Sequence, residues 1–204
     1  MSSINFQSGI VRFNNLVFGK VIQKNGLQGL FSKINLPQNG YFLEIGSKNG
    51  YALPIIQKYF SPKKLIGTDI DENSLKVAKE NIIKKELKNI EIKTADAQRL
   101  PFQSSIFDTV FMFATLHHIP DWKKAISEVS RVLKEKGYFV FREPLAKFYK
   151  IPFTKYFDKP AALFTEEELK NILKFHNFKI TYFNWRGFYK NFFHASVEVV
   201  CQKC

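Results

Sequence analysis

The stretch Phe42-Leu-Glu44-Ile-Gly46-Ser-Lys48-Asn-Gly50 shows the pattern of a strand followed by a turn, and this pattern indicates the fold of the chain. A short apolar run, typical of a buried strand, leads into a turn with two glycines, and a helical pattern follows to Tyr59. The same order returns at Lys64–Asp69, where Asp71 or Asn73 caps the next helix. Repeated strand–helix units of this kind predict a parallel sheet that is covered on both faces.

Further elements follow outward from this unit. The pattern predicts strands at 89–94, 107–113 and 138–141, and a helix that begins at Asp121 and is closed by Gly137. Thr165-Glu-Glu-Glu168 is a capping box for a helix through His176, and alternating strands follow at 179–185 and 195–202. We interpret residues 1–204 as one domain with four parts: a helical cap (1–36), a ligand-binding core (38–142), a lid-like segment (145–163), and a final helix with two strands (165–204).

The composition is that of an ordinary globular protein, with 45% hydrophobic and 24% charged residues, and it excludes wholesale disorder. The longest apolar stretch, Thr109–Leu116, is far shorter than the roughly 20 residues of a membrane-spanning helix. Residues 1–9 lack the pattern of a secretory signal. The two cysteines, Cys201 and Cys204, cannot form a disulfide framework and are at most half of a zinc site, so we expect no metal and a cytoplasmic location.

The net charge of +13 would suit a polyanionic partner such as a nucleic acid. The excess is spread evenly along the chain and consists mostly of lysine, whereas arginine is the better fork for phosphates and bases. A basic solvated surface is therefore favoured, and a nucleic-acid partner stays open. The 22 phenylalanines indicate an aromatic-rich core or an apolar pocket. The oligomeric state stays open.

The residues after each strand should carry the chemistry, because ligands of an open parallel sheet bind beyond the carboxyl ends of its strands. Glycines after the first strand would let a ligand approach the backbone closely. Asp69 ends the second strand, at a position where a carboxylate commonly accepts both ribose hydroxyls. Asp96 follows the third strand, and His117 and His118 follow the fourth.

Seven short motifs arrive in order: Phe42-Leu-Glu-Ile-Gly46, Ile66-Gly-Thr-Asp-Ile-Asp71, Ala95-Asp-Ala97, Leu100-Pro-Phe102, Phe107-Asp-Thr-Val110, Leu116-His-His118 and Arg131-Val-Leu-Lys-Glu-Lys-Gly137. Over about residues 38–142 this order resembles the class I S-adenosylmethionine-dependent methyltransferases. More narrowly, it is similar to the type 11 methyltransferase domain of quinone-biosynthesis and other small-molecule enzymes. The resemblance implies a Rossmann-like α/β fold: a seven-stranded, mostly parallel sheet with helices on both faces and an antiparallel last strand.

The resemblance also implies which residues bind S-adenosylmethionine. Glu44 would hold its methionine end, Gly46 would let the chain pass beneath it, and Asp69 would accept from the ribose hydroxyls. Ile70 would pack on the adenine, and Asp96 would meet the adenine amino group. The full set implied for the cofactor is Glu44, Gly46, Ser47, Gly50, Asp69, Ile70, Asp96, Ala97, Phe113 and Ala114.

The implied activity is an in-line transfer of the methyl group to a small-molecule acceptor. His117, His118 and Glu143 are the candidate bases, since each follows a strand beside the expected methyl group. The basic and aromatic residues of 142–160 suit an acceptor that is aromatic or a flat or amphiphilic anion, or a membrane headgroup region. They equally suit a lid that only covers the cofactor. Two alternatives stay open: an RNA or protein methyltransferase, and a degenerate module that binds the cofactor without catalysis.

One residue departs from the family pattern, which often reads Gly-x-Gly-x-Gly in the first loop. Here Lys48 stands at the middle glycine position. We expect this lysine to adopt ordinary backbone angles. Its cation would either face the sulfonium of the cofactor, which is unfavourable, or reach the donor's carboxylate, which is favourable.

Overall fold

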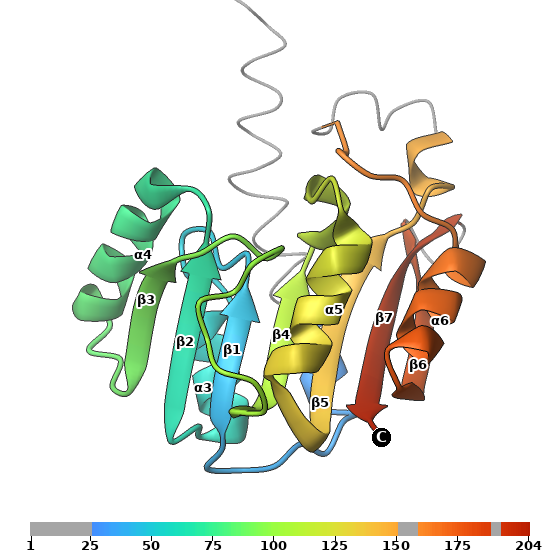
Figure 1. The fold of residues 1–204 in the computed structure, drawn as a ribbon. Coiled ribbons are helices and arrows are strands. Elements are labelled where there is room, and N and C mark those ends of the chain that lie inside the picture. The colour runs from blue at the N-terminus through green and yellow to red at the C-terminus, as the bar shows by residue number, and fades with distance from the viewer. Residues whose placement is uncertain (1–25, 151–158, 189–192) are drawn as a thin grey trace, which may run out of the picture.

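The computed structural model describes residues 26–150, 159–188 and 193–204. Its centre is a seven-stranded sheet in the order β3-β2-β1-β4-β5-β7-β6 (Figure 1). β1 pairs in parallel with β2 and β4, whereas β7 is antiparallel to both β5 and β6. The strands are β1 (Tyr41–Ile45), β2 (Lys64–Asp69), β3 (Ile90–Thr94), β4 (Phe107–Phe113), β5 (Leu133–Pro144), β6 (Phe178–Phe188) and β7 (Phe193–Lys203). The expected class I sheet is therefore confirmed.

Four helices connect these strands: α3 (Leu53–Phe60), α4 (Glu72–Lys84), α5 (Trp122–Val132) and α6 (Glu166–Phe175). The predicted caps are confirmed. The Asp71 carboxylate accepts from the backbone N–H groups of Asn73 and Ser74, and Thr165 and Glu168 form a reciprocal capping box. Within the described ranges, the helices are all too short or too polar to cross a membrane.

Two hydrophobic cores cover the two faces of the sheet. One face is covered by α5 and α6 (Figure 1). The core on this face includes Met112 and Phe141. On the other face α3 and the helical residues 26–31 pack over Phe42 and Phe111. The rings of Phe31, Phe60 and Phe111 lie 4.9–6.0 Å apart between centroids. Phenylalanine was expected in an aromatic-rich core or in an apolar pocket, and these residues lie in the core.

Two predicted segments lie partly outside the described residues. Of the predicted cap at 1–36, residues 26–31 are helical, and 1–25 are not described. The lid-like segment includes a 3₁₀ turn at Phe148–Lys150, and its residues 151–158 are not described. The backbone N–H groups of Ala161 and Ala162 donate to the carbonyl of His117, at 2.9 and 3.0 Å. The end of this segment is therefore tied to the loop after β4.

The predicted end of the helix from Asp121 is wrong. α5 ends at Val132 rather than near Gly137, and β5 begins at once. Leu133 already has extended backbone angles and pairs with Phe107, one residue before a register shift in the β4–β5 ladder. Pairing with a distant strand therefore outweighs the local helical pattern, since tertiary contacts routinely override propensity.

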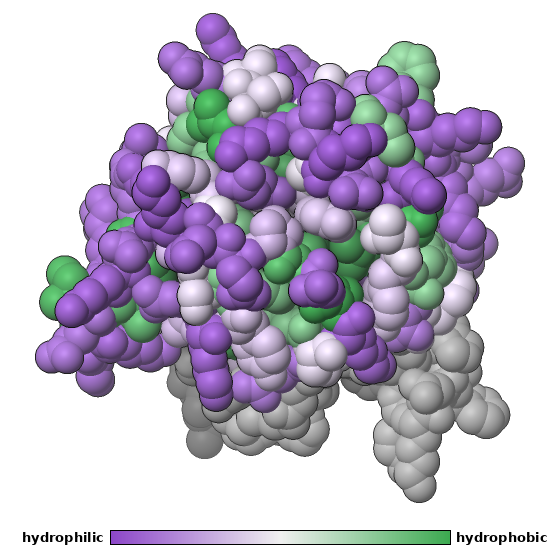
Figure 2. All heavy atoms as spheres, turned by 90° about the horizontal axis from the view of Figure 1, so that it is seen from below, coloured by the Kyte–Doolittle hydropathy of each residue, from purple (hydrophilic) through white to green (hydrophobic). Residues whose placement is uncertain are grey.

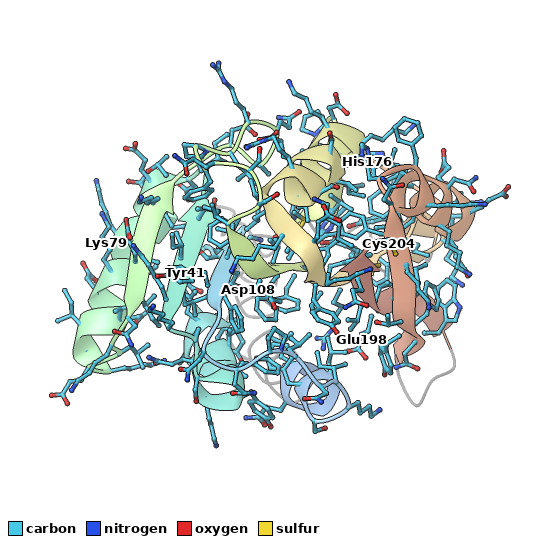
Figure 3. All side chains as sticks on the ribbon, turned by 60° about the horizontal axis from the view of Figure 1, so that its bottom comes forward. Tyr41, Lys79, Asp108, His176, Glu198 and Cys204 are labelled. Atoms are coloured by element: carbon cyan, nitrogen blue, oxygen red, sulfur yellow. The ribbon has the colours of Figure 1, made fainter. Side chains whose placement is uncertain are left out.

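The amino-terminal edge of the parallel strands shows a mainly hydrophilic surface (Figure 2). Here Asp108 accepts hydrogen bonds from the backbone N–H of Tyr41 at 2.8 Å and from the Lys134 ammonium at 2.7 Å. Tyr41 and Asp108 are labelled side by side in Figure 3. The ammonium groups of Lys63 and Lys134 lie 5.5 and 5.9 Å from the centroid of the Tyr41 ring. These two lysines thus interact with side chains of the fold itself.

Candidate active site

A pocket of about 290 Å³ lies at the carboxyl ends of β1, β2, β3 and β4. Residues after all four strands contribute to it, so the strand ends meet at one place as the sequence predicts. Five residues of the predicted cofactor set line it: Gly46, Asp69, Ile70, Asp96 and Ala97. His118 lines it as well. Sequence reasoning did not assign six other lining residues, which are Ile45, Ala95, Gln98, Thr115, Ile119 and Pro120.

The loop after β1 is fixed by backbone hydrogen bonds. The N–H groups of Gly46 and Ser47 both donate to the carbonyl of Thr68 at 2.8 Å. Gly46 and Gly50 have φ values of 74° and 73°, which glycine adopts without strain. Lys48 lies between them with φ 46°, so the expectation of ordinary backbone angles is wrong. The lysine keeps the left-handed conformation that a glycine would adopt more easily.

Asp69 anchors this loop with both of its carboxylate oxygens. Oδ2 accepts from the backbone N–H of Lys48 at 2.8 Å, and Oδ1 accepts from that of Asp71 at 3.0 Å. Each oxygen of an ionised carboxylate accepts about two hydrogen bonds, so further donors can still bind. Ile70 follows with 69% of its side chain exposed. An acceptor for hydroxyls therefore lies beside an open apolar surface.

Asp96 lies across the pocket from this loop, after β3. Its Oδ1 accepts from the backbone N–H of Gln98 at 2.8 Å and from the Gln98 side chain at 3.2 Å. Ala97 beside it is almost fully buried. Gln98 therefore fixes the carboxylate of Asp96. Its own place in the pocket lining was not predicted, because a glutamine in a turn carries no signal of its own for a ligand.

Glu44 is buried beside the pocket rather than in its lining. It is only 3% exposed, and its Oε2 has no hydrogen-bond partner among the described residues. The hydroxyl of Ser47, also 3% exposed, likewise lacks a partner there. Burial, together with the nearby negative charge of Asp69, raises the pKa of Glu44 to about 8. Two polar groups are thus desolvated without a hydrogen bond from the described residues.

The remaining residues of the predicted cofactor set lie outside the lining of this pocket. Gly50 packs under α4, where an added Cβ would come within 3.1 Å of the Ala78 Cβ. The Phe113 ring lies 6.0 Å from that of Phe31, on the face covered by residues 26–31. Ala114 has a left-handed φ of 50° and donates its N–H to the carbonyl of Arg142.

The three candidate bases occupy different environments. Glu143 is fully buried, and its Oε1 accepts from the backbone N–H groups of Thr115 and Leu116 at 2.7 and 2.9 Å. Its Oε2 lies 2.7 Å from Nδ1 of His117, which is itself 6% exposed. The ring of His118 lies 4.0 Å from that of His117 and lines the pocket. Of the three, His118 is therefore the one that a bound molecule would meet.

Gly46 is expected to tolerate no larger residue, because the loop packs directly on Thr115. An added Cβ at Gly46 would lie 2.2 Å from Oγ1 and 2.3 Å from Cγ2 of Thr115. Together with the left-handed backbone, we expect Gly46→Ala to lower the free energy of unfolding by about 3 kcal/mol in urea titrations. In a Thr115→Gly background the clash is removed, so the same substitution should cost only the strain of the left-handed backbone, about 1–2 kcal/mol. An equal cost in both backgrounds would contradict the proposed clash.

Glu44 is expected to make the protein less stable as the pH rises. Its pKa is about 8 in the folded state against an ordinary 4.5, so between these values the folded chain keeps a proton that the unfolded chain has lost. The contribution of Glu44 to stability therefore falls from about pH 4.5 to about pH 8 and then levels off. Urea unfolding of the parent and Glu44→Gln should show a difference that grows in favour of the variant over this range. Parallel curves would refute the burial argument.

The described residues include no group of three or more His, Cys, Asp or Glu side chains that could hold a metal ion. Cys201 is fully buried on β7, and burial raises the pKa of its thiol, whereas Cys204 is exposed. The two cysteines thus differ sharply in environment.

Comparison with known sequences places the core of the chain in one family. Residues 43–141 match the profile of the family described as "Methyltransferase domain". The demethylmenaquinone methyltransferase of Lactococcus lactis is 38% identical over 97 residues, which are 46% of this chain and 38% of that protein. The enzyme of the same name from Bacillus cereus is 35% identical over 74 residues, 36% of this chain and 31% of that protein. The matched parts therefore span about a third of these relatives.

Comparison with solved structures gives matches over most of the chain. A SAM-dependent methyltransferase from Methanosarcina mazei has a TM-score of 0.66 and 25% identity, and the match covers 82% of this chain and 94% of that one. A SAM-dependent methyltransferase from Aquifex aeolicus has a TM-score of 0.73 at 19% identity, over 97% and 98% of the two chains. The latter likeness concerns the fold alone. With the matched profile, the strand order and the motifs at the strand ends, the chain belongs to the class I S-adenosylmethionine-dependent methyltransferases.

Proposed function

We propose that this chain transfers a methyl group from S-adenosylmethionine to a small-molecule acceptor. The observation that carries the proposal is the pocket at the carboxyl ends of β1–β4, in which Asp69, Ile70 and Asp96 converge. Family membership supports the donor, and the demethylmenaquinone methyltransferases among the relatives support a small acceptor. Because the matches span about a third of those relatives, the acceptor is inferred from this chain's own residues.

The residues of the pocket fit the adenosine part of the donor. Asp69 is partly buried, held by two backbone N–H groups, and has acceptor capacity left for the two ribose hydroxyls. Ile70 offers an exposed apolar surface for a flat ring, and Asp96 on the opposite side can accept from an exocyclic amino group. Charge-assisted bonds of this kind are about twice as strong as neutral ones.

The buried groups under the glycine loop fit the amino-acid end of the donor. Glu44 Oε2 and the Ser47 hydroxyl are desolvated and unpartnered among the described residues, a costly arrangement that a bound ammonium group would relieve. Glu44 would ionise on binding such a group, since a close positive charge favours the carboxylate form. We assign the methionine end to this side and the adenosine end to the pocket.

S-adenosylmethionine, when bound, supplies a methyl carbon on a sulfonium sulfur. The chain's contribution is to hold donor and acceptor in line, and orientation of this kind can contribute about 7–11 kcal/mol to catalysis. His118 lines the pocket and is the candidate to accept a proton from an acceptor that must lose one. Glu143 and His117 lie behind it and fix the loop from which His118 projects.

The segment after β5 supports an acceptor that is aromatic or anionic. The Tyr149 ring lies 6.1 Å from that of His117, and the Lys147 ammonium lies 3.3 Å from the centroid of the Trp185 ring. One ring of this segment thus lies beside the loop after β4, and a cation of the same segment lies over a ring of β6. Such side chains bind flat or anionic molecules by stacking and by charge.

The test is equilibrium binding followed by turnover. Isothermal titration calorimetry should show one site per chain for S-adenosylhomocysteine, and no heat at millimolar ligand would refute the donor assignment. Transfer of a labelled methyl group should then be assayed on quinols, phenols and amino acids, with RNA and protein as competing acceptor classes. Salt-sensitive turnover on RNA would favour a macromolecular acceptor. Binding without turnover on any acceptor would favour a non-catalytic module.

A further inference from the structure

Lys48 places a positive charge in a pocket whose other fully charged lining residues, Asp69 and Asp96, are carboxylates. Its side chain is exposed to solvent, and its ammonium group forms no ion pair with any side chain that the structure describes. Its hydrogen bond to the described part of the chain is made by the backbone N–H, which donates to Asp69 at 2.8 Å. The cation is therefore available to a bound molecule.

The backbone of Lys48 argues that the side chain has a use. A left-handed φ costs a residue with a Cβ roughly 1–2 kcal/mol, and the flanking Gly46 and Gly50 show that this loop accommodates glycine. Glycine at position 48 would make the same backbone hydrogen bond to Asp69 without that cost. Nine described non-glycine residues have a left-handed φ, and Lys48 is the one among them that lines the pocket, so its side chain is the one placed to meet a ligand.

Glu44 provides the complementary group on the other side of Gly46. Its Oε2 is buried and unpartnered among the described residues, and it forms no ion pair with Lys48. Glu44 and Lys48 are four residues apart, near the end of β1 and in the loop after it, and neither side chain has a partner of opposite charge among the described residues. An acceptor and a cation so arranged match a ligand end that carries an ammonium and a carboxylate together. The chemical group with that character is an α-amino-acid zwitterion.

We propose that Lys48 recognises the α-carboxylate of the methyl donor, opposite the ammonium site at Glu44, and thereby selects donors and products with an intact amino-acid end. This inference rests on the proposed function. A lysine cation near a sulfonium is otherwise a Coulomb penalty, and pairing with the carboxylate offsets it. Lys48 is thus a specificity-determining residue at a position where the family pattern has glycine.

The experiment compares three ligands with neutral sulfur by titration calorimetry: S-adenosylhomocysteine, its decarboxylated form S-adenosyl-3-thiopropylamine, and 5′-methylthioadenosine. The parent chain should bind S-adenosylhomocysteine about tenfold more tightly than the decarboxylated form, the ratio expected for one charge-assisted contact. Lys48→Met should reduce this ratio to about two, because it removes the charge. Lys48→Arg should retain most of it, because it keeps the charge. Both variants keep an unbranched side chain at this position, so they are a matched pair. Affinity for methylthioadenosine should stay the same in all three proteins.

The outcomes separate the two proposals. If no ligand binds the parent chain, the proposed function fails and this inference fails with it. If all three ligands bind but Lys48→Met leaves the ratio unchanged, the donor assignment stands and the role of Lys48 is refuted. Thermal unfolding checks that the variants fold. If Lys48→Met does not fold, the parent alone decides. Added salt should weaken S-adenosylhomocysteine more than its decarboxylated form, because the two ligands share the ammonium and differ only in the carboxylate. Equal salt dependence of these two ligands would overturn the proposal.

Discussion

Replacing Asp69 by alanine is expected to weaken the binding of S-adenosylhomocysteine about a hundredfold or more. Two ribose hydroxyls would lose a charged acceptor, and a hydrogen bond to a charged group contributes about 1.5–3 kcal/mol. The backbone N–H groups of Lys48 and Asp71 would lose their acceptor as well, so the loop after β1 would also be less well fixed. Titration calorimetry of the two proteins measures the change directly.

Asp69→Asn is the matched control, because it keeps the shape and one carbonyl oxygen while removing the charge. We expect a loss of about tenfold, between the parent and Asp69→Ala, since neutral hydrogen bonds are about half as strong as charged ones. Asp71→Asn serves as a second control. Asp71 lies two residues further along and caps α4, so this change should lower stability without a comparable loss of affinity. Unchanged affinity in Asp69→Ala would refute the assignment of the ribose to this carboxylate.

The sequence predicted the strands well because buried parallel strands are continuous apolar runs. The predicted bounds of β2 and β4 agree with the structure, and Asp71 caps α4 as expected. The end of α5 was not predictable from its own residues. Leu133 leaves the helix because Phe107, distant in the chain, pairs with it. Local patterns thus define an element, and contacts between distant residues decide where it stops.

For the candidate site, the sequence identified which residues follow each strand but not the direction of each side chain. Asp69 and Asp96 do line the pocket, whereas Phe113 points to the core around Phe31. Alternation along a strand predicts two faces but does not say which of them a ligand uses. The left-handed backbone of Lys48 was missed for a different reason. Lysine itself does not indicate that conformation, but the glycine of the family pattern at this position does, since glycine adopts a positive φ without strain.

His117 and His118 illustrate the same limit. They are adjacent in the sequence and were equal candidates, yet a 3₁₀ turn directs one ring toward Glu143 and the other toward the pocket. The residue that decides between them is Glu143, more than twenty residues away on β5. The sequence therefore identified His117, His118 and Glu143 as candidates. Only the structure shows that the His118 ring lines the pocket, whereas His117 and Glu143 interact with each other behind it.

Glu143→Ala is expected to be the most destabilising change at this site. It would leave the N–H groups of Thr115 and Leu116 and the Nδ1 of His117 without an acceptor in a buried place. An unsatisfied buried group costs about 1–3 kcal/mol, so we expect the free energy of unfolding to fall by about 4 kcal/mol in urea titrations. Glu143→Gln keeps the shape and can still accept from both N–H groups, and its loss should be about half as large.

We also expect Glu143→Ala to weaken ligand binding in the pocket. Glu143 holds the turn from which Thr115 and His118 enter the lining, so folded Glu143→Ala should bind S-adenosylhomocysteine about tenfold more weakly, or roughly 1.4 kcal/mol. Glu198→Gln is the control for the loss of a buried carboxylate. Glu198, on β7, pairs with Arg142 at 2.7 Å and lies outside the pocket lining, so this change should lower stability and leave affinity unchanged. If both variants lost affinity equally, general destabilisation would explain the result and Glu143 would have no specific role in positioning the loop.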